Sequence, residues 1–184
     1  PARAALDPAM IAALGTRQIA GLTSTQFGTL APAQIGALGT TAVDALTATA
    51  LSGMTATGLS AMSTTQIAVL DPSQIAAIST EAIAGGGATL LTALTDTQFA
   101  ALTSRQIGGL TGSEIEALPA SRVAALTTTQ VRGLTATGLS AFSADQFAAL
   151  GTRQVAALST GAVSGLTATA IKGLAATQIE ALST

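Results

Sequence analysis

Residues 103–110 read TSRQIGGL, and residues 127–134 read TTTQVRGL. The same pattern, with the consensus T-x-T-Q-I-x-A-L, divides residues 7–182 into 22 octads without insertion or deletion. Position 5 of the octad is Ile, Val, Leu or Phe in every copy, and position 8 is large and apolar in all but the octad that ends at Gly86. A fixed short period is typical of solenoid proteins, whose repeats bury their apolar side chains against their neighbours.

Three signals predict one short helix in each octad. Position 1 is Ser, Thr or Asp in 15 octads and Gly in four more, and these residues favour helix N-caps. Position 4 is Gln or Glu in 12 octads, which completes a capping box with position 1. Pro8, Pro32 and Pro72 all fall at position 2, where the first helical residue needs no N–H. The helix is therefore expected to run from position 2 to about position 7.

Two other secondary structures compete with this interpretation. In one continuous α-helix, eight residues overshoot two turns by about 80°, so the apolar residues would spiral around the helix. A β-solenoid requires side chains that alternate between the two faces with period two, which the adjacent apolar positions 7 and 8 do not follow. A turn at each Leu would make the β-solenoid possible all the same. We expect an all-α solenoid of 22 octads coiled into a superhelical rod or tube, with the β-solenoid as the alternative. Residues 1–184 are expected to form one repeat array, an excerpt of a longer one.

The charges predict which octad positions face inward. From residue 7 onward, every Asp, Glu, Lys and Arg falls at positions 1, 2, 3, 4 or 6. Because an unpaired buried charge is costly, positions 5, 7 and 8 are predicted to lie inside. Position 7 is Ala or Gly in 20 octads, and such small residues, as at Gly21, Gly53 and Gly133, would let neighbouring helices approach closely.

A few residues depart from the repeat or could suggest a site. Phe27, Phe99 and Phe147 occupy position 5 and are predicted to replace Ile in the core. Glu114 and Glu116 are close in sequence but diverge by about 200° on a helix, so we interpret them as solvated surface charges rather than paired catalytic carboxylates. The Gly85–Gly87 run removes one core Leu without shifting the phase, which indicates either a bend or a tolerated packing defect.

The composition argues against most kinds of catalytic, metal-binding and nucleic-acid-binding site. The 184 residues include no Cys, His, Trp, Tyr or Asn, so cysteine and histidine metal sites, thiol catalysis and histidine acid–base catalysis are excluded. Only 9% of residues are charged, and seven basic residues are too few to neutralise a nucleic-acid backbone. No apolar stretch reaches the 18 residues of a transmembrane helix. We expect no enzyme, and no catalytic, cofactor-binding or metal-binding residues.

The recurring string Leu-Thr-x-x-Gln, followed by Ile, Val or Phe, resembles a known kind of repeat. It occurs as LTDTQF at residues 94–99 and LTTTQV at residues 126–131. It is similar to the Ala/Thr/Leu-rich tandem repeats of very large bacterial secreted or surface proteins, often described as adhesin-like or haemagglutinin-like. The resemblance implies an extracellular or cell-surface structural molecule. It carries over no functional residues, since the similarity lies in the packing repeat itself.

These features together predict a structural role. A surface of Thr, Ser, Ala and Gly with little charge offers weak repulsion against contact with further copies of the chain. We expect a segment of an extracellular fibre, sheath or adhesin stalk that associates with itself, end to end or laterally. A solenoid binding module that holds a peptide or glycan is the alternative. An ice-binding array of Thr side chains is a more remote one.

Overall fold

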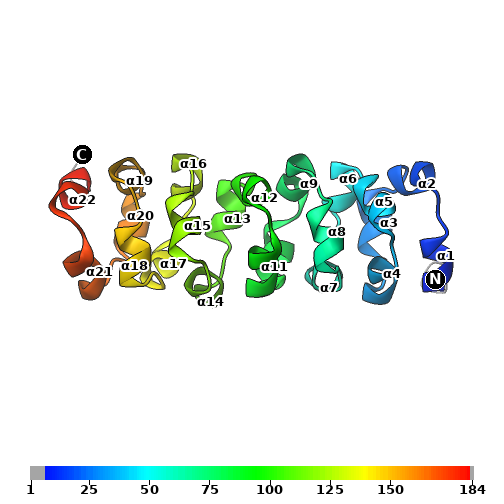
Figure 1. Cartoon of the computed structure of the whole chain (residues 1–184), viewed down its shortest axis with the longest axis horizontal. Helices are drawn as coiled ribbons and strands as arrows, with labels where there is room; N and C mark the ends of the chain where they lie inside the picture. Colours follow the sequence, from blue (N-terminus) through cyan, green and yellow to red (C-terminus); the bar gives the residue numbers. More distant parts are fainter. Residues whose placement is uncertain (1–6, 183–184) are drawn as a thin grey trace. The chain divides into compact units, whose positions relative to one another are not determined.

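The computed structural model of the protein describes residues 7–182, apart from the side chain of Thr169. Within this range the chain forms 22 short α-helices, one in each octad, and no β-strand (Figure 1). The all-α solenoid is therefore confirmed, and the β-solenoid is not favoured.

Contacts divide the chain into two compact units, Pro1–Ala101 and Leu102–Thr184. The expectation of a single array over residues 1–184 stays a prediction. The first unit contains α1 (Pro8–Ala12), α2 (Thr16–Ala20), α3 (Ser24–Gly28), α4 (Pro32–Gly36), α5 (Thr40–Asp44), α6 (Ala48–Leu51), α7 (Ala56–Ser60), α8 (Thr64–Ala68), α9 (Pro72–Ala77), α10 (Thr80–Gly85), α11 (Gly87–Ala93) and α12 (Asp96–Ala100). The second contains α13 (Ser104–Gly108), α14 (Gly112–Glu116), α15 (Ala120–Ala124), α16 (Thr128–Val131), α17 (Ala136–Ser140), α18 (Ala144–Ala148), α19 (Thr152–Ala156), α20 (Thr160–Val163), α21 (Ala168–Gly173) and α22 (Ala176–Ala181).

The helices begin where the capping signals predict. All except α11 start at position 2, after an N-cap residue at position 1. In α13, for example, the Thr103 hydroxyl accepts from the Gln106 backbone N–H at 3.2 Å, and Gln106 Oε1 accepts from the Thr103 N–H at 2.7 Å. The prolines at position 2 are the first residues of α1, α4 and α9. Most helices end at position 6, one residue earlier than predicted, with position 7 as the C-cap.

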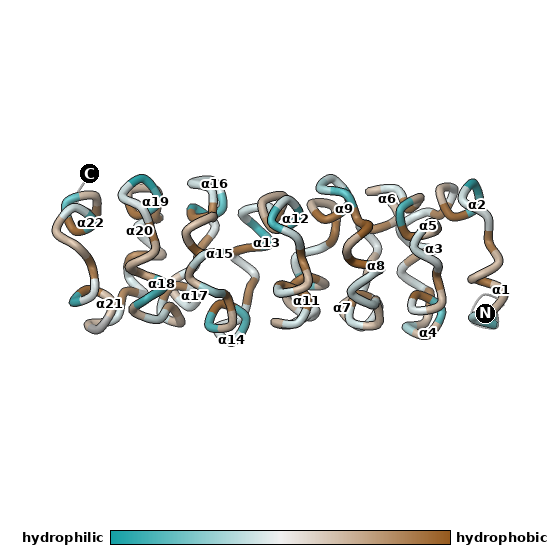
Figure 2. The backbone as a smooth tube through the Cα atoms, viewed as in Figure 1, coloured by the Kyte–Doolittle hydropathy of each residue, from teal (hydrophilic) through white to brown (hydrophobic). Residues whose placement is uncertain are grey.

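Successive octads turn, so that helices three octads apart lie against each other. In the first unit this pairing runs from α1 with α4 to α9 with α12, and in the second from α13 with α16 to α19 with α22. Each unit is therefore a coil of short helices whose turns stack on one another. Hydrophobic segments recur along the chain between less hydrophobic ones (Figure 2), as expected when each octad contributes to both the interior and the surface.

The prediction of the inward positions is only partly right. Positions 5 and 8 line the interior, and Phe27, Phe99 and Phe147 are at most 2% exposed, which confirms their place in the core. The third inward position is 4, which is buried in 18 of the 22 octads, whereas no residue at position 7 is buried. Positions 4, 5 and 8 span about 100° of an ideal helix, but positions 5, 7 and 8 span about 160°, so the first set makes the narrower buried face.

Position 7 nevertheless has the packing role predicted from its small residues. A Cβ atom added to Gly53 would overlap the backbone carbonyl of Ser24, and one added to Gly133 would overlap that of Ser104. Both contacts reach three octads back, to the helix in the adjacent turn of the coil. Gly21 is an exception, because only the backbone of its own helix lies near it.

The Gly85–Gly87 run joins two helices almost directly. Only Gly86 separates α10 from α11, and Gly87 has the only positive φ among the described residues, 71°. Leu90, at position 4 of the next octad, is 4% exposed, and a side chain on Gly86 would overlap it. Leu90 therefore fills space left by the missing Leu at position 8, and the repeat continues in phase.

Candidate functional site

The described residues contain no cluster that suggests catalysis or metal binding. Between residues 7 and 182, no group of three or more Asp and Glu side chains could hold a metal ion. None of the helices in this range is long and apolar enough to span a bilayer. Glu116 is exposed, as predicted, but the prediction for Glu114 is wrong, because its side chain is only 2% exposed. It is buried because position 4 points into the coil.

The most regular polar feature is a set of buried glutamines at position 4. Gln146 Oε1 accepts from the Ser143 N–H at 2.8 Å, which caps its own helix. Its Nε2 donates to the carbonyls of Ile115 and Leu118, both at 2.7 Å and both four octads earlier. We call the glutamines with this second bond the glutamine ladder. Its members with described Nε2 bonds are Gln66, Gln74, Gln98, Gln130, Gln146, Gln154 and Gln178.

The glutamine ladder satisfies backbone groups at both ends of a short helix. The first N–H groups and last C=O groups of a helix have no partner within it, and in a five-residue helix they are most of the backbone. A primary amide supplies an acceptor and two donors, so one side chain serves an N-terminus and a C-terminus together. The octad pattern predicts the capping bond but not the second bond. A signal for the second bond is that position 4 has 11 Gln and one Glu, although Glu completes a capping box equally well.

Glu114 shows what happens when the donor is missing. Its Oε2 accepts from the Thr111 N–H at 2.7 Å and from the Thr111 hydroxyl at 2.8 Å, so the capping function is kept. Its Oε1 is buried and is the one such side-chain atom in the described part of the chain without a hydrogen-bond partner. A Glu side chain lacks the NH₂ group that Gln offers to a second backbone segment, which sets this octad apart from those with Gln at position 4.

One titratable group is shifted by its place in a cap. The Asp71 carboxylate, at the N-cap of α9, accepts from the Ser73 hydroxyl at 2.6 Å and the Gln74 backbone N–H at 2.8 Å. These hydrogen bonds, the Ser73 bond foremost, hold the pKa of Asp71 below its ordinary value, because they favour the charged form. The group is exposed and acts as a helix cap.

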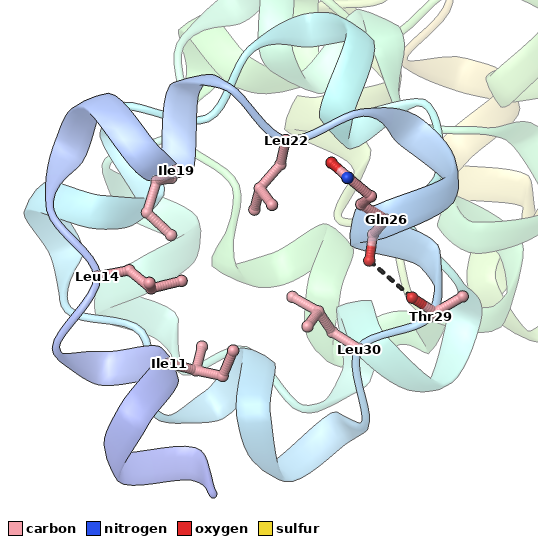
Figure 3. A pocket seen from close by; sticks show the side chains of 7 residues that line it. All are labelled: Ile11, Leu14, Ile19, Leu22, Gln26, Thr29 and Leu30. Carbon is pink, nitrogen blue, oxygen red and sulfur yellow. Dashed lines mark hydrogen bonds between the residues drawn. The ribbon is translucent and has the colours of Figure 1, made fainter. Parts of the chain in front are cut away.

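The first turn of the coil leaves apolar side chains uncovered. Leu14, Leu22 and Leu30, at position 8 of the first three octads, are only half-buried, whereas Leu38 in the fourth octad is buried. Their side chains point toward the centre of the ring formed by the first turn (Figure 3). With Ile11 and other residues they line a cavity of about 140 Å³. This surface of Leu14, Leu22 and Leu30 is named the leucine face.

The last turn leaves a different set of residues uncovered. Ile171 and Ile179, at position 5 of the last two octads, are 49% and 48% exposed. Ile107 and Ile115, at the same position within the second unit, are at most 2% exposed. We name the surface of Ile171 and Ile179 the isoleucine face. Leu158, Leu166 and Leu182, at position 8 of the last four octads, are half-buried as well.

Comparison with known proteins identifies one part of the chain. The family model of the ALTTAQ repeat matches residues 123–160, which extend from the end of α15 to the start of α20. No curated protein matches the chain. Residues 123–160 are therefore similar to ALTTAQ repeats, and the chain is a protein of tandem helical repeats.

Proposed function

We propose that the protein is a structural repeat protein, a segment of an extracellular fibre, sheath or adhesin stalk that associates with copies of itself. The observation that carries this proposal is the regular stacking of turns within each unit, in which helices three octads apart pack together and ladder glutamines bind backbone carbonyls four octads earlier. Each turn repeats the contact of the turn before it. Solenoids of this kind extend by adding like repeats, without a new kind of interface.

The weakly charged outer surface of the coil also supports a mechanical rather than a chemical role. Outward positions carry mostly Thr, Ser, Ala and Gly, and the net charge is −2. Such a surface offers little electrostatic repulsion between copies and few groups that could steer a charged ligand. The one family match is to a tandem repeat, which favours an architecture that extends by repetition.

Self-association is tested by electron microscopy and sedimentation velocity of the purified chain over a concentration series. The proposal expects ordered filaments or oligomers whose size increases with concentration. Particles that stay monomeric at every concentration would overturn self-association and favour a passive spacer. Saturable binding of a peptide or glycan by such monomers would favour the alternative, a solenoid binding module.

The extracellular location rests on the resemblance to repeats of large secreted and surface proteins, and it needs its own test. Intact cells that produce the protein are labelled with an antibody raised against residues 123–160. Labelling before permeabilisation, with a cytoplasmic marker protein unlabelled, supports the proposal. Labelling only after permeabilisation would contradict it.

A further inference from the structure

We propose that the first unit contains a binding site for a small aliphatic primary amide, in a cavity that takes the place of a missing ladder glutamine. The cavity has a volume of about 230 Å³ and is lined by residues of α7, α8 and α11 together with Met62 and Gly86. Further octads precede and follow these helices within the same unit, so the cavity does not depend on where the sequence begins or ends. The site is independent of the proposed self-association.

The cavity lies where the glutamine ladder is interrupted. Leu90 stands at position 4 of the octad from which a ladder member would reach back to residues 55–62. Ladder amides donate to the carbonyls at positions 5 and 8 four octads earlier, and several also donate to the carbonyl at position 6. In residues 55–62 these positions are Leu59, Met62 and Ser60, and the same three residues line the cavity. The cavity therefore occupies the place that a ladder amide fills in other octads.

The carbonyls beside the cavity lack hydrogen bonds that their counterparts have. The Ile115 carbonyl accepts from the Leu118 N–H at 3.1 Å and also from Gln146 Nε2 at 2.7 Å. The Leu59 carbonyl accepts from the Met62 N–H at 3.1 Å, but from no side-chain amide. The Met62 carbonyl has no hydrogen-bond partner among the described residues. Two acceptors are thus available to a donor that enters the cavity.

The Gly85–Gly87 run keeps the cavity from being filled by the chain. Leu90 packs against Gly86, where a Cβ would overlap it, and so occupies the space of the missing position 8 side chain. A Cβ on Gly85 would overlap that of Ala56 in α7. Gly87 has a φ of 71°, in the left-handed region that favours glycine. All three glycines are therefore required for the way in which α10 and α11 form this wall.

The lining selects a small neutral molecule with two adjacent N–H donors. A primary amide offers two N–H groups from one nitrogen, and these are the donors that the ladder uses on the equivalent carbonyls. A charged ammonium group would have to lose its hydration without a counter-ion, because none of the lining residues is charged. Leu59, Met62, Ile67 and Leu90 supply apolar walls for a short alkyl group. The volume is below the roughly 300–1,000 Å³ of pockets for drug-sized ligands, so the molecule has only a few carbon atoms.

The opening of the cavity carries a donor for the oxygen of the amide. Thr89 is exposed, and its hydroxyl makes no hydrogen bond to another described residue. The neighbouring Ser60 hydroxyl is already used, since it donates to the carbonyls of Ala56 at 2.9 Å and Gly85 at 3.2 Å. Thr89 is therefore the side chain that would bind the amide oxygen.

The first test compares two probes on the wild-type protein. Isobutyramide has a short alkyl group and a primary amide, whereas N,N-dimethylisobutyramide keeps the alkyl group and the oxygen but has no N–H. Saturation-transfer NMR of the probe measures its dissociation constant whatever the size of the protein assembly. Isobutyramide is expected to bind saturably with a dissociation constant of about 1–10 mM, as suits a ligand of six heavy atoms. The dimethyl amide is expected to bind at least about 10-fold more weakly, because it leaves both carbonyls without a donor.

The second test fills the cavity from the chain itself. Leu90→Gln supplies a position 4 amide to the carbonyls of Leu59 and Met62 and is expected to weaken isobutyramide binding at least about 10-fold. Thr92→Gln is the matched control, because it introduces the same side chain on the exposed face of the same helix. This control is expected to bind isobutyramide like the wild type. Circular dichroism shows whether both variants keep the helical fold, and the comparison of the two probes needs no variant.

Three results would overturn the site. The first is the absence of saturable isobutyramide binding to the wild type. The second is equal affinity for the two amides, which would mean that the cavity takes up apolar molecules without using its carbonyls. The third is a folded Leu90→Gln protein that binds isobutyramide like the wild type, which would place the amide elsewhere. Each of these results leaves the proposed self-association unaffected.

Discussion

The glutamine ladder makes a quantitative prediction for Gln146→Glu. The substitution keeps an oxygen for the Ser143 cap but replaces Nε2, which donates to the Ile115 and Leu118 carbonyls at 2.7 Å. Losing two hydrogen bonds costs about 1–3 kcal/mol, and leaving a buried oxygen opposite two carbonyl oxygens costs a further 1–3 kcal/mol or so. The expected loss of unfolding free energy is therefore about 2–6 kcal/mol, a large share of a typical domain's stability.

The assay is urea unfolding followed by helical circular dichroism at low protein concentration. With an m value of about 2 kcal/mol/M, the midpoint is expected to fall by about 1 M or more. Hydrogen exchange measured on peptides from residues 111–118 and 143–150 should show the loss of protection in the two octads that Gln146 joins. A repeat array transmits such a change mainly to nearest neighbours, so distant octads should change less.

Gln18→Glu is the matched control, because it makes the same chemical change at the same octad position. Gln18 Oε1 caps its own helix at 2.9 Å, and its Nε2 has no described partner. Its unfolding free energy is expected to stay within about 0.5 kcal/mol of wild type. Equal effects of Gln146→Glu and Gln18→Glu would refute the claim that the bonds four octads back stabilise the fold.

Three further predictions test individual octads. Glu114→Gln removes the buried oxygen that has no partner and should raise the free energy of unfolding by about 1–3 kcal/mol. Glu116→Gln, on the exposed face, should change that free energy by less than about 0.5 kcal/mol. Similar changes in the two variants would contradict the prediction. Gly133→Ala should destabilise the fold by about 1–3 kcal/mol in thermal unfolding, because the added Cβ would overlap a carbonyl of the adjacent turn. Gly112→Ala, whose Cβ would be 3.5 Å from its nearest neighbour, should be neutral or stabilising. A neutral Gly133→Ala would show that the turns can separate there. Because the folded pKa of Asp71 is lowered, its carboxylate stabilises the protein above about pH 4, and this contribution is lost as the pH falls further. Between pH 6 and pH 2, the melting temperatures of the wild type and of Asp71→Asn should therefore converge toward the acid end. A constant difference between the two would argue against a stabilising carboxylate.

The local part of this structure could be predicted from the sequence because its causes lie within one octad. A cap at position 1, a Gln at position 4 and an occasional Pro at position 2 set the start of each helix through contacts that span three residues or fewer. The large apolar residues at positions 5 and 8 then mark the buried face, as Ile107 and Leu110 show. An eight-residue repeat without insertion or deletion is sufficient to predict 22 helices and a solenoid.

The tertiary structure decided how octads meet, because the rotation from one octad to the next is set by packing across turns rather than by any local signal. Only that rotation brings Gln146 beside the carbonyls of Ile115 and Leu118, 31 and 28 residues earlier. It also places position 4 inside and position 7 at the contact between turns. The burial of Glu114 could not be predicted for the same reason, since a charged residue at position 4 indicates a solvent-facing side chain unless the backbone of another turn is known to lie there.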